Sequence, residues 1–176
     1  PLARSGMTWL AVLLVLAAFF AIRWLTAAGV FTSVTPLSPN ICQPIARLQG
    51  PEDFEIDAAH DAVIVSSTNR RAQKNAPDPG DGLYVLKLSA PHAAPVKLTN
   101  GVPKDFHPHG ISIWTAPDGK QTLFVVNHPG GAERSRVEIF DVDASGLLNH
   151  RSSVPADAYP RLNDVAGAGP DAFYAT

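Results

Sequence analysis

The apolar positions of this sequence follow one pattern before residue 31 and another beyond residue 50. No charged residue occurs from Ser5 to Ile22, and the apolar character resumes after a single arginine. This uncharged run approaches the roughly 20 residues that a helix needs to cross a hydrocarbon layer about 30 Å thick. The indoles of Trp9 and Trp24 fall where interfacial aromatic residues occur in membrane helices. The pattern therefore predicts a transmembrane or signal-anchor helix in residues 1–31.

Three interpretations of this apolar segment are compatible with its sequence. Its length favours an uncleaved anchor, the small residues of "LTAAG" are typical of a cleaved signal peptide, and a buried core helix is also apolar. Orientation has weak support, because Arg4 before the run is nearly balanced by Arg23 after it. Both membrane-targeting interpretations place the rest of the chain outside the cytoplasm, in a membrane-anchored or secreted protein.

Short strands are predicted for the rest of the chain. Residues 32–50 contain prolines and little periodicity, which indicates a connector, and the polar segment 69–82 is predicted to be a surface loop. Beyond Gly50 no segment has the 3.6-residue apolar period of a helix. Residues 51–176 are therefore predicted to be all-β. Strands are expected within 54–67, 83–88, 110–114, 122–128, 137–143 and 163–176.

A repeat within these strands predicts a β-propeller. Three polar-to-apolar openings, marked by Glu52, His109 and Asn163, are 57 and 54 residues apart. A period near 50 residues with about four strands per unit is typical of propeller blades, whose innermost strands begin around one axis. About two and a half such units follow Gly50, whereas propellers close with four to eight blades. We therefore expect a partial propeller, a fragment that ends within a strand at Thr176.

Composition narrows the possible partners. The 176 residues are 45% hydrophobic with a net charge of −2, and the lysines and arginines are scattered. This length suffices for a domain with a sizeable core, and the lack of a basic stripe argues against nucleic acid as a partner. Cys42 is the single cysteine. Outside the cytoplasm a lone thiol points to a pairing partner elsewhere, although a small buried hydrophobe is equally compatible.

Oxygen-bearing side chains open two of the three repeats. Glu52 and Asp53 come from the first repeat, and Asn163 and Asp164 from the third. Carboxylate and amide oxygens are the hard ligands that Ca²⁺ takes in sets of six to eight. Taken singly, each pair is also typical of a turn whose side chains face water or bond their own backbone. Convergence around a propeller axis would make them candidate calcium ligands.

Histidines open the middle repeat in "FHPHGIS". An imidazole is a poor calcium ligand, but it titrates near neutral pH and suits a general base. His109 precedes Gly110, whose missing side chain permits close backbone approach, and His128 ends the next strand. We expect these two rings to share a proton, one orienting the other toward water, and His107 to be a neighbour only through the turn. The remaining histidines are predicted to face solvent: His60, His92 and His150.

Five ordered motifs resemble the paraoxonase and arylesterase family: "PEDFEID", "FHPHGIS", "LFVVNHP", "VEIF" and "LNDVAGAGPDAFYAT". The resemblance runs from about Asn40 to Thr176 and is strong because all five occur in order with compatible spacing. It implies a six-bladed β-propeller preceded by a hydrophobic helix, with two calcium ions in the central tunnel. It also implies calcium-dependent hydrolysis of lactones and aryl esters, with organophosphates as substrates of some members.

The resemblance also implies individual site residues. The implied calcium ligands are Glu52 and Asn163 for the catalytic ion, and Asp53, Asp164 and the backbone carbonyl of Ile111 for the structural ion. His109 matches the proposed general base and His128 its partner. Cys42 matches a position that is disulfide-bonded to a cysteine near the family's C-terminus, beyond this chain. His107 departs from the asparagine typical of animal paraoxonases, and the other catalytic ligands lie in later blades, so the chain alone is expected to be inactive.

Two other functions are compatible with these patterns. One is a calcium-bound propeller lactonase of the gluconolactonase or regucalcin type, although its motifs match less well. The other is a membrane-tethered propeller that uses calcium only for rigidity and serves as a binding scaffold, since fold alone does not decide function. The partners expected for the first-choice function are a small ester or lactone and, through the N-terminal helix, a membrane.

Overall fold

The computed structural model describes residues 2–35, 48–70, 78–98, 101–130, 134–157 and 161–176. The chain divides into two compact units, residues 1–43 and 44–176. Cys42 and most of the predicted connector lie outside the described residues.

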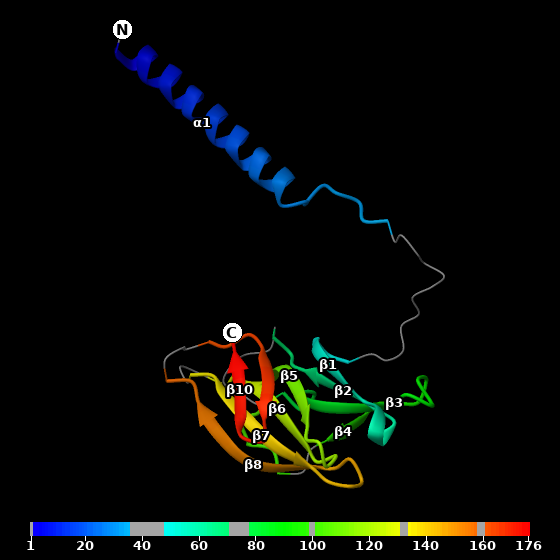
Figure 1. The fold of residues 1–176 in the computed structure, drawn as a ribbon. Helices are drawn as coiled ribbons and strands as arrows, with labels where there is room; N and C mark the ends of the chain where they lie inside the picture. Colours follow the sequence, from blue (N-terminus) through cyan, green and yellow to red (C-terminus); the bar gives the residue numbers. More distant parts are fainter. Residues whose placement is uncertain (1, 36–47, 71–77, 99–100, 131–133, 158–160) are drawn as a thin grey trace. The chain divides into compact units, whose positions relative to one another are not determined.

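In the first unit, the described residues 2–35 form the helix α1 (Leu2–Ala27; Figure 1) and a short segment after it. Its segment Thr8–Ala27 is 20 residues long with a mean hydropathy of 2.2, long and apolar enough to cross a membrane by length and composition. Near the end of the helix the Thr26 hydroxyl donates to the Ile22 carbonyl over 2.8 Å, which hides a polar group within the apolar segment. A signal sequence has the same properties, so the helix alone does not distinguish the two membrane-targeting interpretations.

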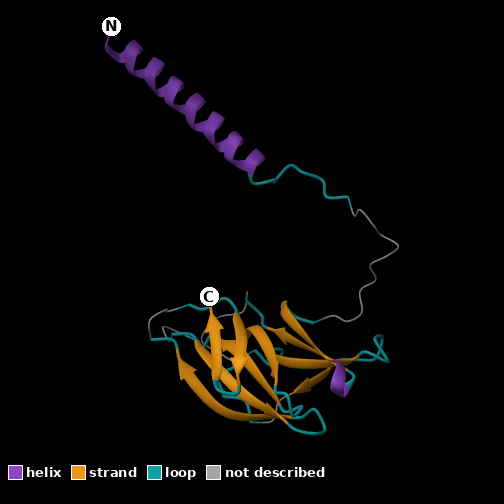
Figure 2. Cartoon of the chain, viewed as in Figure 1, coloured by secondary structure: helices purple, strands orange, loops and turns teal. Residues whose placement is uncertain are grey.

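The second unit consists mainly of strands and loops (Figure 2). Its sheets are antiparallel, and neighbouring strands in each sheet are also consecutive in sequence. The first sheet contains β1 (Pro51–Asp57), β2 (Ala62–Ser67), β3 (Gly82–Lys87) and β4 (Val96–Leu98), with a 3₁₀ turn (Ala58–His60) between β1 and β2. The second contains β5 (Pro108–Thr115), β6 (Gln121–Asn127), β7 (Arg136–Val142) and β8 (Leu148–Pro155). A hairpin of β9 (Val165–Gly169) and β10 (Ala172–Ala175) follows.

Two four-stranded meanders and a hairpin, each starting from an inner strand, are successive blades of a propeller. The predicted all-β class and partial propeller are confirmed. The sequence did not predict β4 and β8. Of the eight residues in β8, only Leu148 is buried, so this strand depends on backbone pairing with β7 and carries no apolar pattern.

The core lies between the blades, and β6 is buried on both faces. Leu123 and Val125 belong to the cluster shared with the first sheet, which includes Ile64 of β2. The alternate residues Phe124 and Val126 pack with the residues around β9 and β10. This two-sided burial explains why the β6 sequence is continuously apolar rather than alternating.

Side chains connect the inner strands of neighbouring blades. The Ile111 N–H on β5 donates to Asp53 Oδ2 on β1 over 2.8 Å, and the Gly167 N–H on β9 donates to Ser112 Oγ over 3.1 Å. The Thr68 hydroxyl, just after β2, donates to the Pro108 carbonyl over 2.7 Å. These bonds satisfy backbone groups that the sheets leave unpaired, and they fix the strand starts relative to one another.

Candidate active site at the inner strand starts

Three strand starts meet at one end of the second unit. Glu52 and Asp53 lie at the start of β1, His109 at the start of β5, and Asn163 and Asp164 directly before β9. β5 contacts both β1 and β9. Residues that are more than 50 positions apart in the sequence are thereby brought to one place. Their catalytic and metal-binding roles stay predictions.

Glu52 and His109 face each other across the boundary between the first two sheets. Glu52 Oε2 lies 3.4 Å from His109 Nδ1, and the side chains are 20% and 16% exposed. Arg70, which follows β2, places Nη2 2.8 Å from Glu52 Oε2 and also contacts the ring nitrogens of His109. Burial lowers the pKa of His109, and the Arg70 charge lowers it further against the opposing effect of Glu52.

The segment before β9 packs directly on β5 at Gly110. A Cβ at position 110 would lie 2.5 Å from Asp164 Oδ1 and 2.8 Å from the Asn163 carbonyl oxygen, so this approach requires glycine. The segment is held by the Asn163 N–H, which donates to the Thr176 carbonyl over 2.5 Å. Because Asp53 bonds the Ile111 N–H, Asp53 and Asp164 both lie against the same stretch of β5 backbone.

His128 lies beside His109, and its Nε2 is buried. The ring centroids are 5.0 Å apart and the ring planes are inclined by 50°. His128 Nδ1 is 3.2 Å from Ser135 Oγ, whereas Nε2 is buried without a hydrogen-bond partner among the described residues. Burial lowers the pKa of His128 to about 4, with further lowering by His109, Arg161 and Arg70. The structure thus brings the two imidazoles together, but no hydrogen bond joins them within its described part.

His107 has a different environment from His109. Its Nδ1 lies 2.6 Å from Oδ2 of Asp81, a buried residue directly before β3. Its backbone N–H donates over 2.8 Å to Asn127 Oδ1, and Asn127 in turn donates over 2.9 Å to Glu138, which is fully buried. His107 therefore fixes the turn before β5, and its carboxylate partner Asp81 differs from Glu52, the carboxylate that lies beside His109.

Two of the histidines expected to face solvent are instead half-buried against carboxylates, so that prediction was wrong. His60 Nδ1 lies 2.6 Å from Asp57 Oδ2, and His150 Nε2 lies 2.9 Å from Glu138 Oε2. Both carboxylates are buried, and a buried carboxylate requires hydrogen-bonding or charged partners. His92 is exposed as predicted.

The carboxylate and amide oxygens at the strand starts are of the type that binds a hard cation. Burial raises the pKa of Glu55, and the negative charges of Asp53 and Asp164 raise it further, although a hydrogen bond from the Ile113 backbone opposes this. The local excess of negative charge is what a divalent cation would neutralise. Within the described ranges, no three His, Cys, Asp or Glu side chains converge as a metal-binding group. The oxygens present are therefore suitable for Ca²⁺ but fewer than its usual six to eight.

Comparisons with known proteins identify the family. A family model described as Arylesterase matches residues 31–176. The chain belongs to the arylesterase family. Serum paraoxonase/lactonase 3 of Homo sapiens is 34% identical over 149 residues, covering 81% of this chain and 42% of the relative. Serum paraoxonase/arylesterase 2 of Gallus gallus has the same identity and coverage, and serum paraoxonase/lactonase 3 of Oryctolagus cuniculus is 32% identical over 154 residues, with 84% and 43% covered.

The family resemblance seen in the motifs is thus confirmed. The chain spans about two fifths of the length of the curated relatives it matches. The residues matched by the arylesterase family model include both four-stranded sheets and the hairpin. All of the strand starts described above therefore lie within the matched region.

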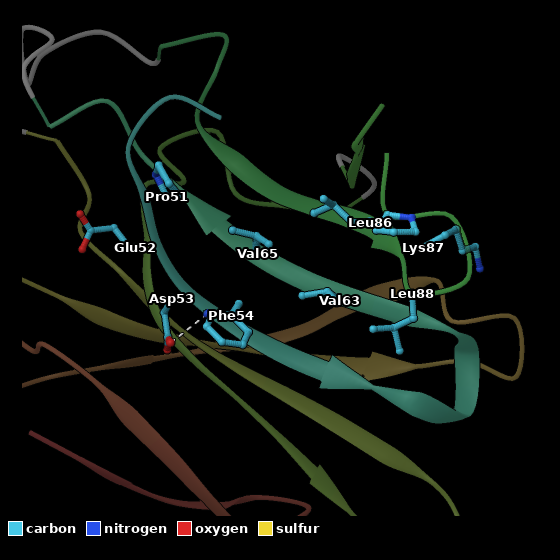
Figure 3. Close-up of a pocket in the computed structure, with 10 residues that line it drawn as sticks. Pro51, Glu52, Asp53, Phe54, Val63, Val65, Leu86, Lys87 and Leu88 are labelled. Carbon is cyan, nitrogen blue, oxygen red and sulfur yellow. Dashed lines mark hydrogen bonds between the residues drawn. The ribbon is translucent and has the colours of Figure 1, made fainter. Parts of the chain in front are cut away.

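A largely apolar cavity of about 380 Å³ lies on the first sheet, and Glu52 and Asp53 are among its lining residues (Figure 3). Most of its wall is formed by β1, β2 and the end of β3. The apolar lining residues are Pro51, Phe54, Val63, Val65, Leu86, Leu88 and Pro91. His109 does not line it, so this cavity is next to the candidate site but does not contain it.

Sequence reasoning missed the cationic and supporting residues of this site. Arg70 lies in a segment predicted to be an ordinary surface loop, and nothing in the sequence distinguishes it from the adjacent Arg71. Ser135, directly before β7, contacts His128 from a position without any motif. Asp81 was missed for the same reason. Asp81 differs from the other polar residues of its turn only in being buried. A single sequence does not show which of its polar residues are buried.

Proposed function

We propose that this chain contributes two blades of a calcium-dependent hydrolase that acts on lactones and aryl esters. Family membership supports a hydrolase, since the relatives are named paraoxonase, arylesterase or lactonase. The observation that carries the proposal is the 3.4 Å approach of Glu52 Oε2 to His109 Nδ1. It places an oxygen ligand suited to Ca²⁺ beside a side chain suited to general-base catalysis.

In this proposal the strand starts divide the ligands between two calcium ions. Glu52 and Asn163 would hold the catalytic ion, while Asp53, Asp164 and the Ile111 carbonyl would hold the structural one. Bound calcium supplies Lewis-acid stabilisation of the charge that develops on a substrate carbonyl or phosphoryl oxygen. The packing of Asp164 on Gly110 supports this division, because it brings ligands from β5 and the segment before β9 together.

His109 would act as the general base. Its lowered pKa keeps the ring neutral at neutral pH, so that a ring nitrogen is able to accept a proton from the attacking water. His128, with its pKa near 4, is also neutral and lies 5.0 Å away between ring centroids. We assign His128 to orienting His109 and excluding water from one side of its ring.

We further propose that α1 targets the protein to the membrane, with the propeller outside the cytoplasm. The apolar 20-residue segment Thr8–Ala27 supports either an anchor or a signal sequence. A disulfide of Cys42 with a cysteine outside this chain would be consistent with that compartment. Mass spectrometry of the mature N-terminus separates an uncleaved anchor, which retains α1, from a secreted form that has lost it.

A pair of matched substitutions tests the assignment of His109. In the full-length, calcium-loaded protein, we expect His109→Gln to reduce kcat/KM for phenyl acetate by about a hundredfold or more. The control His92→Gln removes an exposed histidine outside the site and should retain activity within about twofold. Equal activity of the two folded variants would contradict the role given to His109. Absence of esterase and lactonase activity in the wild-type protein would favour a tethered binding scaffold.

A further inference from the structure

Arg70 is held at the entrance to the candidate site by its neighbours in the chain. The Thr68 hydroxyl bonds the Pro108 carbonyl over 2.7 Å, and the Asn69 N–H donates to Asp81 Oδ1 over 2.6 Å. These bonds tie the segment after β2 to the turn before β5 and to the start of β3. The two residues that precede Arg70 are therefore anchored to two different neighbouring elements.

The guanidinium of Arg70 lies on the solvent side of Glu52 and His109. The Arg70 side chain is 54% exposed, compared with 20% for Glu52 and 16% for His109. All three meet at Arg70 Nη2. A guanidinium has five N–H donors in a planar fork, so contacts through one nitrogen do not use its capacity to bind another oxygen anion. A molecule that approaches His109 from solvent would meet this cation.

A second arginine supplies positive charge from the neighbouring blade. Arg161 is exposed and precedes Leu162, whose N–H donates over 3.1 Å to Ser135 Oγ. Ser135 Oγ lies 3.2 Å from His128 Nδ1. Arg161 is thus connected to His128 through Leu162 and Ser135, and its charge, like that of Arg70, lowers the pKa of His128.

We propose that Arg70 is a specificity-determining residue that binds an anionic group of the substrate, with Arg161 adding to the positive field. The inference rests on the proposed function and names its substrate class: esters and lactones that carry a carboxylate or similar anion near the scissile bond. Calcium bound at Glu52 would leave the Arg70 charge available to such a group, because the carboxylate would be neutralised by the metal. Charge-assisted bonds to Arg are about twice as strong as neutral ones and discriminate by charge.

The test compares two esters that differ by one carboxylate: phenyl acetate and 4-acetoxybenzoate. In the full-length, calcium-loaded protein, Arg70→Met should lower the ratio of kcat/KM for 4-acetoxybenzoate to kcat/KM for phenyl acetate about tenfold, with the selective loss mainly in KM. Arg70→Lys should recover part of the loss, since it restores the charge without the planar fork. Lys120→Met is the matched control, because it removes one positive charge from the turn at the far end of β5.

Two results would overturn the proposal. Equal losses for both esters, which leave the ratio unchanged, would mean that Arg70 supports Glu52 and His109 rather than the substrate. No loss for either ester would mean that the anion binds elsewhere. Calorimetric titration with 4-hydroxybenzoate, the aromatic product of 4-acetoxybenzoate, tests anion binding by Arg70 without relying on turnover. About tenfold weaker binding to Arg70→Met than to Lys120→Met supports the role of Arg70, and equal binding refutes it. If the wild-type protein hydrolyses neither ester, the proposed function fails, while this titration still tests Arg70.

Discussion

Adding a single methyl group at position 110 should separate two of the three strand starts. In Gly110→Ala the new Cβ would lie 2.5 Å from Asp164 Oδ1, 2.6 Å from Asp164 Cα and 2.8 Å from the Asn163 carbonyl oxygen. Two of these atoms are backbone, so a change of side-chain rotamer does not relieve the overlap. The segment before β9 must move away from β5, and overpacking of this kind typically costs about 1–3 kcal/mol.

The matched control for this substitution lies on the adjacent strand. In Gly169→Ala the new Cβ would lie 3.4 Å from the nearest atom, the Ala172 Cβ, which is an ordinary van der Waals contact. Neither glycine is among those with a positive φ, so backbone strain does not separate the two cases. The comparison therefore isolates the close approach at Gly110.

Urea unfolding and calcium titration measure the two consequences of Gly110→Ala. We expect the free energy of unfolding to fall by about 1–3 kcal/mol relative to Gly169→Ala. Calcium affinity, followed by isothermal titration calorimetry at a temperature where both variants are folded, should also weaken, because Asn163 and Asp164 are proposed ligands. Equal stability and equal calcium affinity would refute the claim that contact with Gly110 holds this segment in place.

Two further predictions concern stability. The pKa of His128 is lowered to about 4 in the folded protein, so protons bind preferentially to the unfolded state between pH 6.5 and 4. The free energy of unfolding should therefore fall by up to about 3 kcal/mol as pH is lowered through this window, and by less to the extent that solvent reaches the partly buried ring. His128→Gln should reduce this slope in urea titrations, and an unchanged slope would assign it to other groups. Phe124 is fully buried beside Phe173, so Phe124→Ala should cost about 3–5 kcal/mol, whereas Leu147→Ala, at a position 50% exposed in the turn between β7 and β8, should cost under about 0.5 kcal/mol. Similar midpoints for these last two variants would contradict the described packing.

The strands that the sequence predicted are those whose stability depends on apolar burial. β6 carries four consecutive buried apolar residues, Leu123 to Val126, because it is covered on both faces. β8 could not be predicted, because its residues are largely exposed and it is held by pairing with β7. Backbone hydrogen bonds are available to every non-proline residue and leave no trace in composition.

The candidate site was predictable where it follows the repeat and unpredictable where it depends on loops. The spacing between Glu52, His109 and Asn163 reflects the blade period, so their convergence could be expected from the sequence. The contacts of Arg70 with Glu52 and His109 depend on the path of the chain after β2. The half-buried state of His150 depends on Glu138, whose burial in β7 is a result of sheet packing rather than of any local pattern.

The most direct test of calcium-dependent hydrolysis is a chelation experiment on the full-length protein. Hydrolysis of phenyl acetate and of an aromatic lactone is measured before chelation, after addition of a calcium chelator, and after calcium is restored. We predict that activity disappears on chelation and returns with calcium, and that Glu52→Gln reduces turnover strongly at saturating calcium. Hydrolysis that persists under chelation, or no hydrolysis by a folded and calcium-loaded protein, would contradict this prediction.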